Sequence, residues 1–185
     1  MDHQLATWVN GWSGHPVLDE VMLWASWLNT RAIIWVAVAL VAAIAVRNAR
    51  GWRLMGAWRV LLAVLLASFV TNDLVKPLAA RERPYQVDSG ITVVGPPPSG
   101  SSFPSGHAAT ATAGAFALGL VAPGLRWAGW AFALLVLLSR IYIGVHFPTD
   151  IVAGALIGLA SAWLATARTP CYISGSVAPA LRVPR

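Results

Sequence analysis

Three polar fragments, far apart in the chain, carry residue types suited to binding and transferring a phosphoryl group. Lysine and arginine side chains donate charge-assisted hydrogen bonds to phosphate oxygens. A histidine can attack phosphorus or move a proton, and a carboxylate can orient it. The fragments are Lys76 with Arg83-Pro84, then Pro104-Ser105-Gly106-His107, then Ser139-Arg140 with His146 and Asp150. Together they predict a site for phosphoryl transfer.

The two histidines and the carboxylate suit different chemical steps. In its neutral form, His146 can attack phosphorus through one ring nitrogen while the other donates to Asp150, which stabilises the imidazolium that forms. The spacing of four residues is suitable because Pro148 favours the first helical turn, so that Asp150 lies within that turn and His146 just before it. His107 can protonate the departing oxygen as a general acid and later activate water.

The remaining polar residues are suited to holding the phosphate. Lys76, Arg83 and Arg140 are expected to gather at the membrane edge, where a multiply charged anion offsets their mutual repulsion. Ser105 and Gly106 are expected at a helix start, where unpaired backbone N–H groups and the helix dipole favour an anion. Gly106 lets the backbone come close, and the Ser105 hydroxyl can donate a hydrogen bond.

The composition indicates a membrane protein. Apolar residues make up 57% of the chain and charged residues 11%, against roughly 25% charged in soluble proteins. The mean hydropathy is +0.65. The formal charge of +6 comes from basic residues at the ends of hydrophobic segments rather than on one polar face, which argues against nucleic-acid binding. A single cysteine, Cys171, excludes an intrachain disulfide and a multi-cysteine metal site.

Apolar segments long enough to be considered as membrane spans occur at 32–46, 54–74, 105–121, 127–142 and 150–167. A span needs roughly 20 residues, so the shorter segments must include flanking residues. Residues 16–28, which carry Asp19 and Glu20, predict an interfacial or re-entrant amphipathic helix. We therefore predict an all-α polytopic transmembrane bundle with five full spans, six being possible. It forms one domain, with an interfacial segment at 1–30, a catalytic core at 31–168 and a polar tail at 169–185.

The alternation of span direction predicts that all three fragments reach the same membrane face. The opposite face would receive the more strongly basic connections, at Arg47, Arg50, Arg53, Arg126 and Arg168. Because positive loops favour the cytoplasm, this face is predicted to be cytoplasmic and to carry the C-terminus. The polar fragments would then face the periplasm or the extracellular side of the cell membrane.

Each feature also has an ordinary structural interpretation. Lys76 and Arg83 can act as interfacial anchors, and Arg140 can form an ion pair with Asp150. Their joint occurrence with two histidines on one face favours the catalytic interpretation. Gly154 and Gly158 on the last span predict close helix packing within the bundle, with dimerisation as the alternative.

At these spacings the fragments resemble the motifs of the type 2 phosphatidic acid phosphatase family, which also includes vanadium haloperoxidases and glucose 6-phosphatase. The family patterns are Lys, six residues, Arg-Pro; Pro-Ser-Gly-His; and Ser-Arg, five residues, His, three residues, Asp. In this chain they are Lys76 to Pro84, Pro104 to His107, and Ser139 to Asp150. Every defining position is matched.

The resemblance implies a role for each matched residue. His146 would be the nucleophile that forms a phosphohistidine, Asp150 its partner and His107 the general acid. The phosphate binders would be Lys76, Arg83, Ser105, Gly106 and Arg140. The resemblance implies that the reaction requires neither metal nor cofactor.

The short N-terminus, which runs into residues 18–22, is similar to compact bacterial members that act on polyprenyl diphosphates. We therefore expect hydrolysis of undecaprenyl or another polyprenyl diphosphate to the monophosphate, with the lipid entering laterally between spans. Phosphatidylglycerophosphate, phosphatidate or a lipid A phosphate are alternative substrates, and phosphotransfer to a second lipid is an alternative reaction. A nonenzymatic lipid-binding or transport protein would not need His107, His146 and Asp150 together. A vanadate-dependent oxidase would be expected to be soluble, which the composition argues against.

Overall fold

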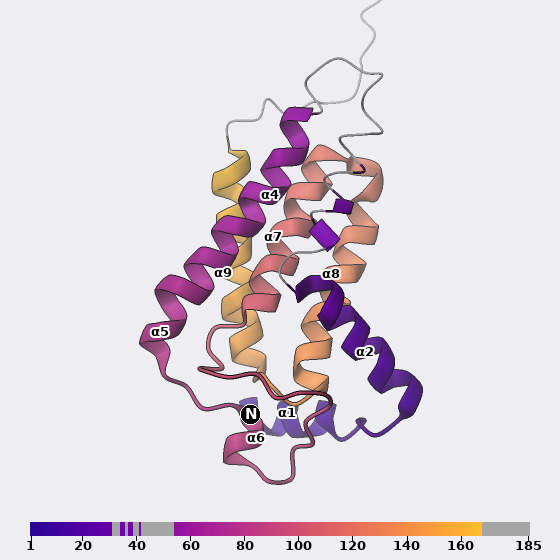
Figure 1. Cartoon of the computed structure of the whole chain (residues 1–185), viewed down its shortest axis with the longest axis vertical. Coiled ribbons are helices and arrows are strands. Elements are labelled where there is room, and N and C mark those ends of the chain that lie inside the picture. Colours follow the sequence, from indigo (N-terminus) through magenta and orange to yellow (C-terminus); the bar gives the residue numbers. More distant parts are fainter. Residues whose placement is uncertain (31–33, 36, 39–40, 42–53, 168–185) are drawn as a thin grey trace, which may run out of the picture.

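The structure, a computed structural model, describes residues 1–30, 34–35, 37–38, 41 and 54–167, and the regular elements among these residues are helices. Among them, four long helices run side by side, and shorter ones gather toward one end (Figure 1). The long helices are α4 (Leu54–Phe69), α7 (Gly106–Val121), α8 (Arg126–Tyr142) and α9 (Pro148–Thr166). The shorter ones are α1 (Asp2–Asn10), α2 (Pro16–Asn29), α5 (Lys76–Ala79) and α6 (Pro84–Val87), with a π-helical turn at Val70–Val75 and a 3₁₀ turn at Pro123–Leu125.

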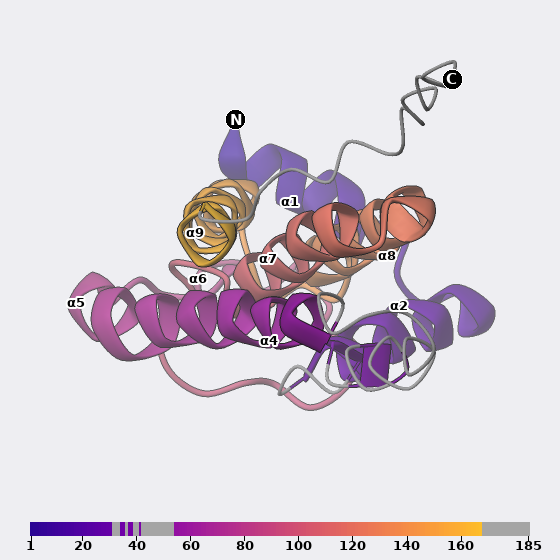
Figure 2. The ribbon, with the colours of Figure 1, turned by 90° about the horizontal axis from the view of Figure 1, so that it is seen from above.

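Helix α7 lies at the centre of the bundle, where it packs against α4, α8 and α9 (Figure 2). Its sequence is rich in alanine, glycine and threonine, and most of these small side chains are buried. Small residues let helix backbones approach closely in a membrane. A side-chain carbon at Gly154 or Gly158 of α9 would collide with the backbone carbonyl of Ser105 or of Ala109. The predicted packing role of this glycine pair within the bundle is confirmed.

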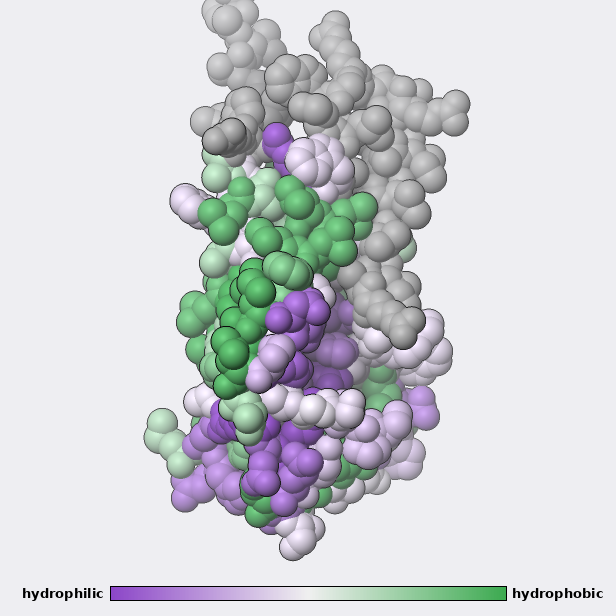
Figure 3. Space-filling model, turned by 60° about the vertical axis from the view of Figure 1, so that its left-hand side comes forward, coloured by the Kyte–Doolittle hydropathy of each residue, from purple (hydrophilic) through white to green (hydrophobic). Residues whose placement is uncertain are grey.

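Large apolar side chains point outward from the long helices. Leu65 on α4, Leu134 on α8 and Trp163 on α9 are each more than half exposed. Figure 3 shows apolar side chains in a band above a hydrophilic lower end. A soluble protein rarely exposes so many large apolar side chains, whereas lipid chains would solvate them.

Three helical stretches among the described residues are long and apolar enough to cross a bilayer: Trp58–Val87, Pro123–Tyr142 and Pro148–Thr166; α7 is a shorter apolar helix. Together with α7, these three stretches correspond to four of the five predicted segments. Most of the fifth, 32–46, lies outside the described residues, as do Arg47, Arg50, Arg53 and the tail at 169–185. The count of five spans therefore stays a prediction.

The N-terminal segment contains two helices. The helix predicted at 16–28 corresponds to α2, which packs against α8. Helix α1 was not predicted, because its nine residues are few and, on average, polar. Tertiary contacts hold it against the lower end of the bundle: the Asn10 side-chain amide donates to the carbonyl oxygens of Thr92 and Tyr142, both at 2.8 Å.

Local capping places the polar fragments at helix starts, as predicted. Ser105 is the N-cap of α7, and its hydroxyl oxygen accepts from the Ala108 backbone N–H at 3.4 Å. Helix α9 begins at Pro148, and Asp150 accepts from the Phe147 backbone N–H at 2.9 Å. The π-helical turn ends directly before Lys76, and such turns occur frequently at functional sites.

Candidate active site

The three polar fragments meet at the lower end of the bundle, around α5 and the start of α9 (Figure 1). The Ser105 backbone N–H donates to the Asp150 carbonyl oxygen at 3.0 Å, which joins the second fragment to the third. The Arg83 Nη1 donates to the Val145 carbonyl oxygen at 3.0 Å, which joins the first to the third. The convergence expected from alternating span directions is therefore confirmed.

His146 and Asp150 lie next to each other in the interior. His146 is 2% exposed and Asp150 is fully buried. The His146 Nδ1 lies 3.4 Å from the Asp150 Oδ2, yet this nitrogen makes no hydrogen bond among the described residues. The pair therefore has the proximity that the sequence predicted, without a hydrogen bond between these two atoms.

The surroundings of His146 favour its neutral form. His146 belongs to the loop between α8 and α9, outside the spans. Burial, together with the positive charges of Arg140, Arg83 and Lys76, lowers the pKa of His146 well below its ordinary value. A neutral imidazole has a free lone pair, which is the form that a nucleophile requires.

Two polar atoms at the centre of the site lack partners. Arg140 is 6% exposed, and its Nη1 donates to the Ser26 hydroxyl of α2. Its Nε, like the Nδ1 of His146, is buried without a hydrogen bond to any described residue. Lys76 lies within electrostatic range of Arg83 and Arg140 and forms no ion pair in the described part of the chain. Buried donors and clustered cations without counter-ions are expensive, so the site is suited to an anion.

Arg83 is positioned differently from the other two cations. Its side chain is buried, and the guanidinium donates to backbone carbonyl oxygens of Gly100 and Val145 at 3.0 Å, Ser99 at 3.1 Å and Ser101 at 3.2 Å. These bonds occupy most of its N–H donors. Arg83 therefore joins the loop before α7 to the loop before α9. Its charge acts on His146 at a distance, because most of its N–H groups already donate to backbone carbonyl oxygens.

His107 lines a cavity of about 450 Å³ with Arg140, Ser26, Thr30 and other residues. Its Nε2 lies 3.3 Å from the hydroxyl of Thr30, the residue that follows α2. Among the lining residues, His107 and Arg140 are the two that the sequence analysis assigned to the chemistry. The predicted general acid thus borders open space beside Arg140, which is predicted to bind phosphate.

Gly106 has a packing role that the sequence analysis did not anticipate, whereas Ser105 caps the helix start at which it was expected. A Cβ at Gly106 would lie 2.7 Å from the Asn72 Oδ1, so this glycine accommodates the π-helical turn. Ser105 is fully buried as the N-cap of α7. Their predicted role as phosphate binders stays a prediction.

Arg81 and Asp2 belong to the site, although the sequence analysis assigned them no role. The Arg81 Nη1 donates to the Asp150 Oδ1 at 2.6 Å, and its Nη2 donates to the Asp2 Oδ2 at 2.8 Å. Arg81 lies inside the six-residue interval of the first motif, which is the one signal in the sequence that points to it. No pattern points to Asp2, because its contact arises when α1 docks against α9.

Comparisons with known proteins agree with this geometry. The sequence profile of the PAP2 superfamily matches residues 56–170, which contain all three fragments. An undecaprenyl-diphosphatase of Sulfolobus acidocaldarius is 34% identical over 129 residues, covering 69% of this chain and 60% of that protein. A lipid A 4'-phosphatase of Porphyromonas gingivalis is 37% identical over 110 residues, covering 54% of this chain and 45% of that protein. The chain thus matches about half of the length of these relatives.

A solved structure has the same fold. It is the transmembrane PAP2 type phosphatidylglycerolphosphate phosphatase of Bacillus subtilis, with a TM-score of 0.72 and 25% identity, covering 90% of this chain and 83% of that one. This likeness confirms the prediction of an all-α, multi-pass transmembrane bundle. Since the profile matches more than half of the chain and includes every motif, the resemblance seen in the sequence is also confirmed: the chain belongs to the PAP2 superfamily.

Proposed function

We propose that this protein is a membrane phosphatase that hydrolyses a lipid phosphate or diphosphate, undecaprenyl or another polyprenyl diphosphate being the favoured substrate. The observation that carries the proposal is a buried His146 beside Asp150, within electrostatic range of Lys76, Arg83 and Arg140. A nucleophile surrounded by cations is suited to attack an anionic phosphoryl group. The undecaprenyl-diphosphatase relative supports the choice of a polyprenyl substrate.

The reaction proceeds in two steps. His146 attacks phosphorus, an N–P bond forms, and the bond from phosphorus to the departing oxygen breaks while His107 protonates that oxygen. Asp150 stabilises the imidazolium. His107 then takes a proton from water, which attacks phosphorus and breaks the N–P bond, releasing inorganic phosphate. The cations stabilise charge on the phosphoryl oxygens in both steps.

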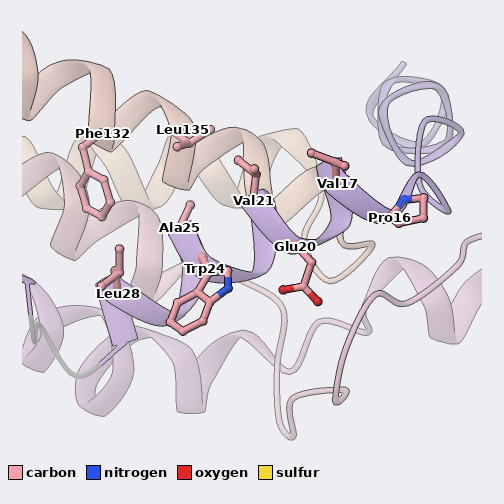
Figure 4. Close-up of a pocket in the computed structure, with 9 residues that line it drawn as sticks. All are labelled: Pro16, Val17, Glu20, Val21, Trp24, Ala25, Leu28, Phe132 and Leu135. Atoms are coloured by element: carbon pink, nitrogen blue, oxygen red, sulfur yellow. The ribbon is translucent and has the colours of Figure 1, made fainter.

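An apolar groove supports lateral entry of the lipid. The groove has a volume of about 610 Å³ and lies between α2 and α8, where Val21 of α2 and Phe132 of α8 line it (Figure 4). Glu20 and Trp24 line both this groove and the cavity of His107. A lipid whose phosphate occupies the cavity can therefore place its apolar chain in the groove, where the chain stays in apolar surroundings like those of the bilayer.

Phosphate release from purified protein in detergent tests the function. We expect release from undecaprenyl diphosphate in the presence of EDTA, since the proposed mechanism uses no metal, and loss of release in His146→Ala. Release unaffected by His146→Ala would contradict the mechanism. Phosphatidylglycerophosphate, phosphatidate and a lipid A phosphate serve as comparison substrates, and a phosphorylated second lipid among the products would instead identify a phosphotransferase.

The histidine intermediate can be trapped separately. Substrate labelled in the terminal phosphate, quenched within one turnover, should leave the label on the protein as an acid-labile, base-stable adduct. The adduct should be absent from His146→Ala. Label found on another residue would exclude His146 as the nucleophile.

We also propose that the site faces the periplasm or the extracellular side and that the C-terminus is cytoplasmic. Arg126, at the opposite end of α8 from Arg140, is consistent with the positive-inside bias. The single native cysteine, Cys171 in the tail, provides the test. A membrane-impermeant maleimide added to intact cells should label Ser89→Cys, in an exposed turn at the site end, in a Cys171→Ser background, and should not label the native Cys171. The reverse pattern would invert the orientation.

A further inference from the structure

The carboxylate of Asp150 has partners on both of its oxygens. The Oδ2 accepts from the Phe147 backbone N–H at 2.9 Å and lies 3.4 Å from the His146 Nδ1. The Oδ1 accepts from the Arg81 Nη1 at 2.6 Å. Charge-assisted hydrogen bonds this short are among the stronger ones in proteins. The hydrogen bonds from Phe147 and Arg81 therefore together fix the orientation of the Asp150 carboxylate, in which Oδ2 lies toward His146.

Arg81 is itself held in place by the N-terminal helix. Its Nη2 donates to the Asp2 Oδ2 at 2.8 Å, its Nη1 also donates to the Thr149 hydroxyl at 2.8 Å, and the guanidinium carbon lies 4.3 Å from the ring centre of Phe147. The Asp2 carboxylate also accepts from the Thr149 backbone N–H at 3.0 Å and from the Thr149 hydroxyl at 2.6 Å. A carboxylate is favoured there because the positive end of the α9 dipole lies beside it.

These contacts distinguish Arg81 from a phosphate ligand. The residues that line the cavity of His107 and Arg140 include neither Arg81 nor Asp2. Asp150 is fully buried, and among the described residues Arg81 is the arginine or lysine in direct ion pair with it. Asp2 forms a second ion pair with Arg81, so the guanidinium bridges the carboxylates of Asp2 and Asp150.

We propose that Arg81 is a positioning residue for the His146–Asp150 pair and that Asp2 holds Arg81 in place, so that helix α1 completes the active site. The inference rests on the phosphatase function proposed above. Loss of a phosphate ligand weakens substrate binding, which raises KM and lowers kcat/KM. A misoriented Asp150 instead slows phosphoryl transfer and lowers kcat.

Steady-state kinetics of Arg81→Ala, Asp2→Ala and the double variant test the proposal. We expect kcat to fall about 10- to 100-fold in Arg81→Ala, as a displacement of about 1 Å can produce, with KM changed less than about threefold. The double variant should be no slower than Arg81→Ala, because Asp2 acts through Arg81. Added guanidinium ion should restore part of the kcat of Arg81→Ala and none of that of Asp150→Ala.

A neighbouring residue of α1 provides the matched control. The His3 Nε2 lies 3.0 Å from the Asp88 Oδ2 and ties the same helix to a different loop. His3→Ala should therefore retain wild-type kcat, even if thermal stability falls as much as in Asp2→Ala. If Arg81→Ala does not fold, Arg81→Lys and Asp2→Asn replace the alanine variants, with kcat expected to fall in both.

Several results would overturn the proposal: a kcat of Arg81→Ala within twofold of wild type, an equal cost of Asp2→Ala with and without Arg81, or an equal loss of kcat in His3→Ala. Imidazole ¹⁵N spectra give a readout that does not depend on turnover. The His146 signals, assigned with His146→Ala, should shift in Arg81→Ala and Asp2→Ala and stay in place in His3→Ala. A wild type that releases no phosphate would refute the proposed function, while these spectra would still decide whether Arg81 positions the pair.

Discussion

The backbone N–H of Ser105 donates to the backbone carbonyl oxygen of Asp150 at 3.0 Å, which joins the start of α7 to the start of α9. His107 lies two residues after Ser105, and His146 lies four residues before Asp150. The distance between the two histidines therefore depends on how closely the two helices pack. Glycines of α9 permit that packing.

Gly154→Ala should destabilise the protein and reduce activity. The added Cβ would collide with the Ser105 carbonyl, and overpacking of this kind costs about 1 to 3 kcal/mol. Gly158→Ala makes a similar collision with Ala109, one turn farther from the site, and should lower stability while sparing more activity. Thermal unfolding in detergent and phosphate release measure both effects. Gly124→Ala is the control, since its Cβ would meet nothing within 4 Å; a Gly154→Ala variant as stable and active as this control would contradict the packing argument.

Arg83→Lys should mainly lower the stability of the protein, whereas Lys76→Gln should mainly lower kcat/KM. Arg83→Lys removes donors from several backbone carbonyls, so we expect unfolding to become easier by about 2 to 4 kcal/mol, with activity lost as the loops separate. Lys76→Gln should leave the unfolding midpoint nearly unchanged and lower kcat/KM about 100-fold, because a cation near the phosphate is lost. Unfolding midpoints and steady-state kinetics of both variants test this prediction. An unchanged midpoint in Arg83→Lys would show that its backbone contacts contribute little.

The acid limb of kcat/KM should lie below pH 6.5. Burial first, then the charges of Arg140, Arg83 and Lys76, lowers the folded-state pKa of His146 below 6.5, so the neutral nucleophile persists as the pH falls through that value. Activity should be retained at about pH 6 and lost at lower pH. The acid limb can arise from titration of the enzyme or of the substrate phosphate. Measuring kcat/KM with two soluble phosphate monoesters of different phosphate pKa distinguishes these, because only a limb that arises from the substrate changes its pH between the two esters. An unmoved limb above pH 6.5 would disagree with the burial of His146.

His107→Gln should slow both steps, to a degree that depends on the leaving group. Loss of the general acid should cost about 100- to 10,000-fold with a lipid monophosphate and much less with p-nitrophenyl phosphate, whose leaving group needs no proton. With the activated ester, the labelled phosphohistidine should accumulate because water is no longer activated. Rapid-quench measurement on both substrates checks this. Equal losses on the two substrates would assign His107 a binding role instead.

Much of the helical frame was predictable from local signals. Pro148 and Ser105 mark the starts of α9 and α7, and apolar runs mark the long helices, because both signals depend on neighbours along the chain. The meeting of the three fragments followed from alternating span directions, which the bilayer imposes. The motif spacings then identified the family.

The tertiary structure decided the positions of individual donors. Nothing in the sequence distinguishes Arg83, whose guanidinium donates to backbone carbonyl oxygens, from Arg140, whose Nε has no hydrogen-bond partner among the described residues. The contact of Asp2 with Arg81 was equally unpredictable, because it joins residues far apart in the chain. The sequence by itself therefore determined the fold class, the family and the residues available for chemistry. Only the tertiary structure decided which of them line the cavity and which hold its walls together, because side-chain hydrogen bonds between distant segments exist only once the helices have packed.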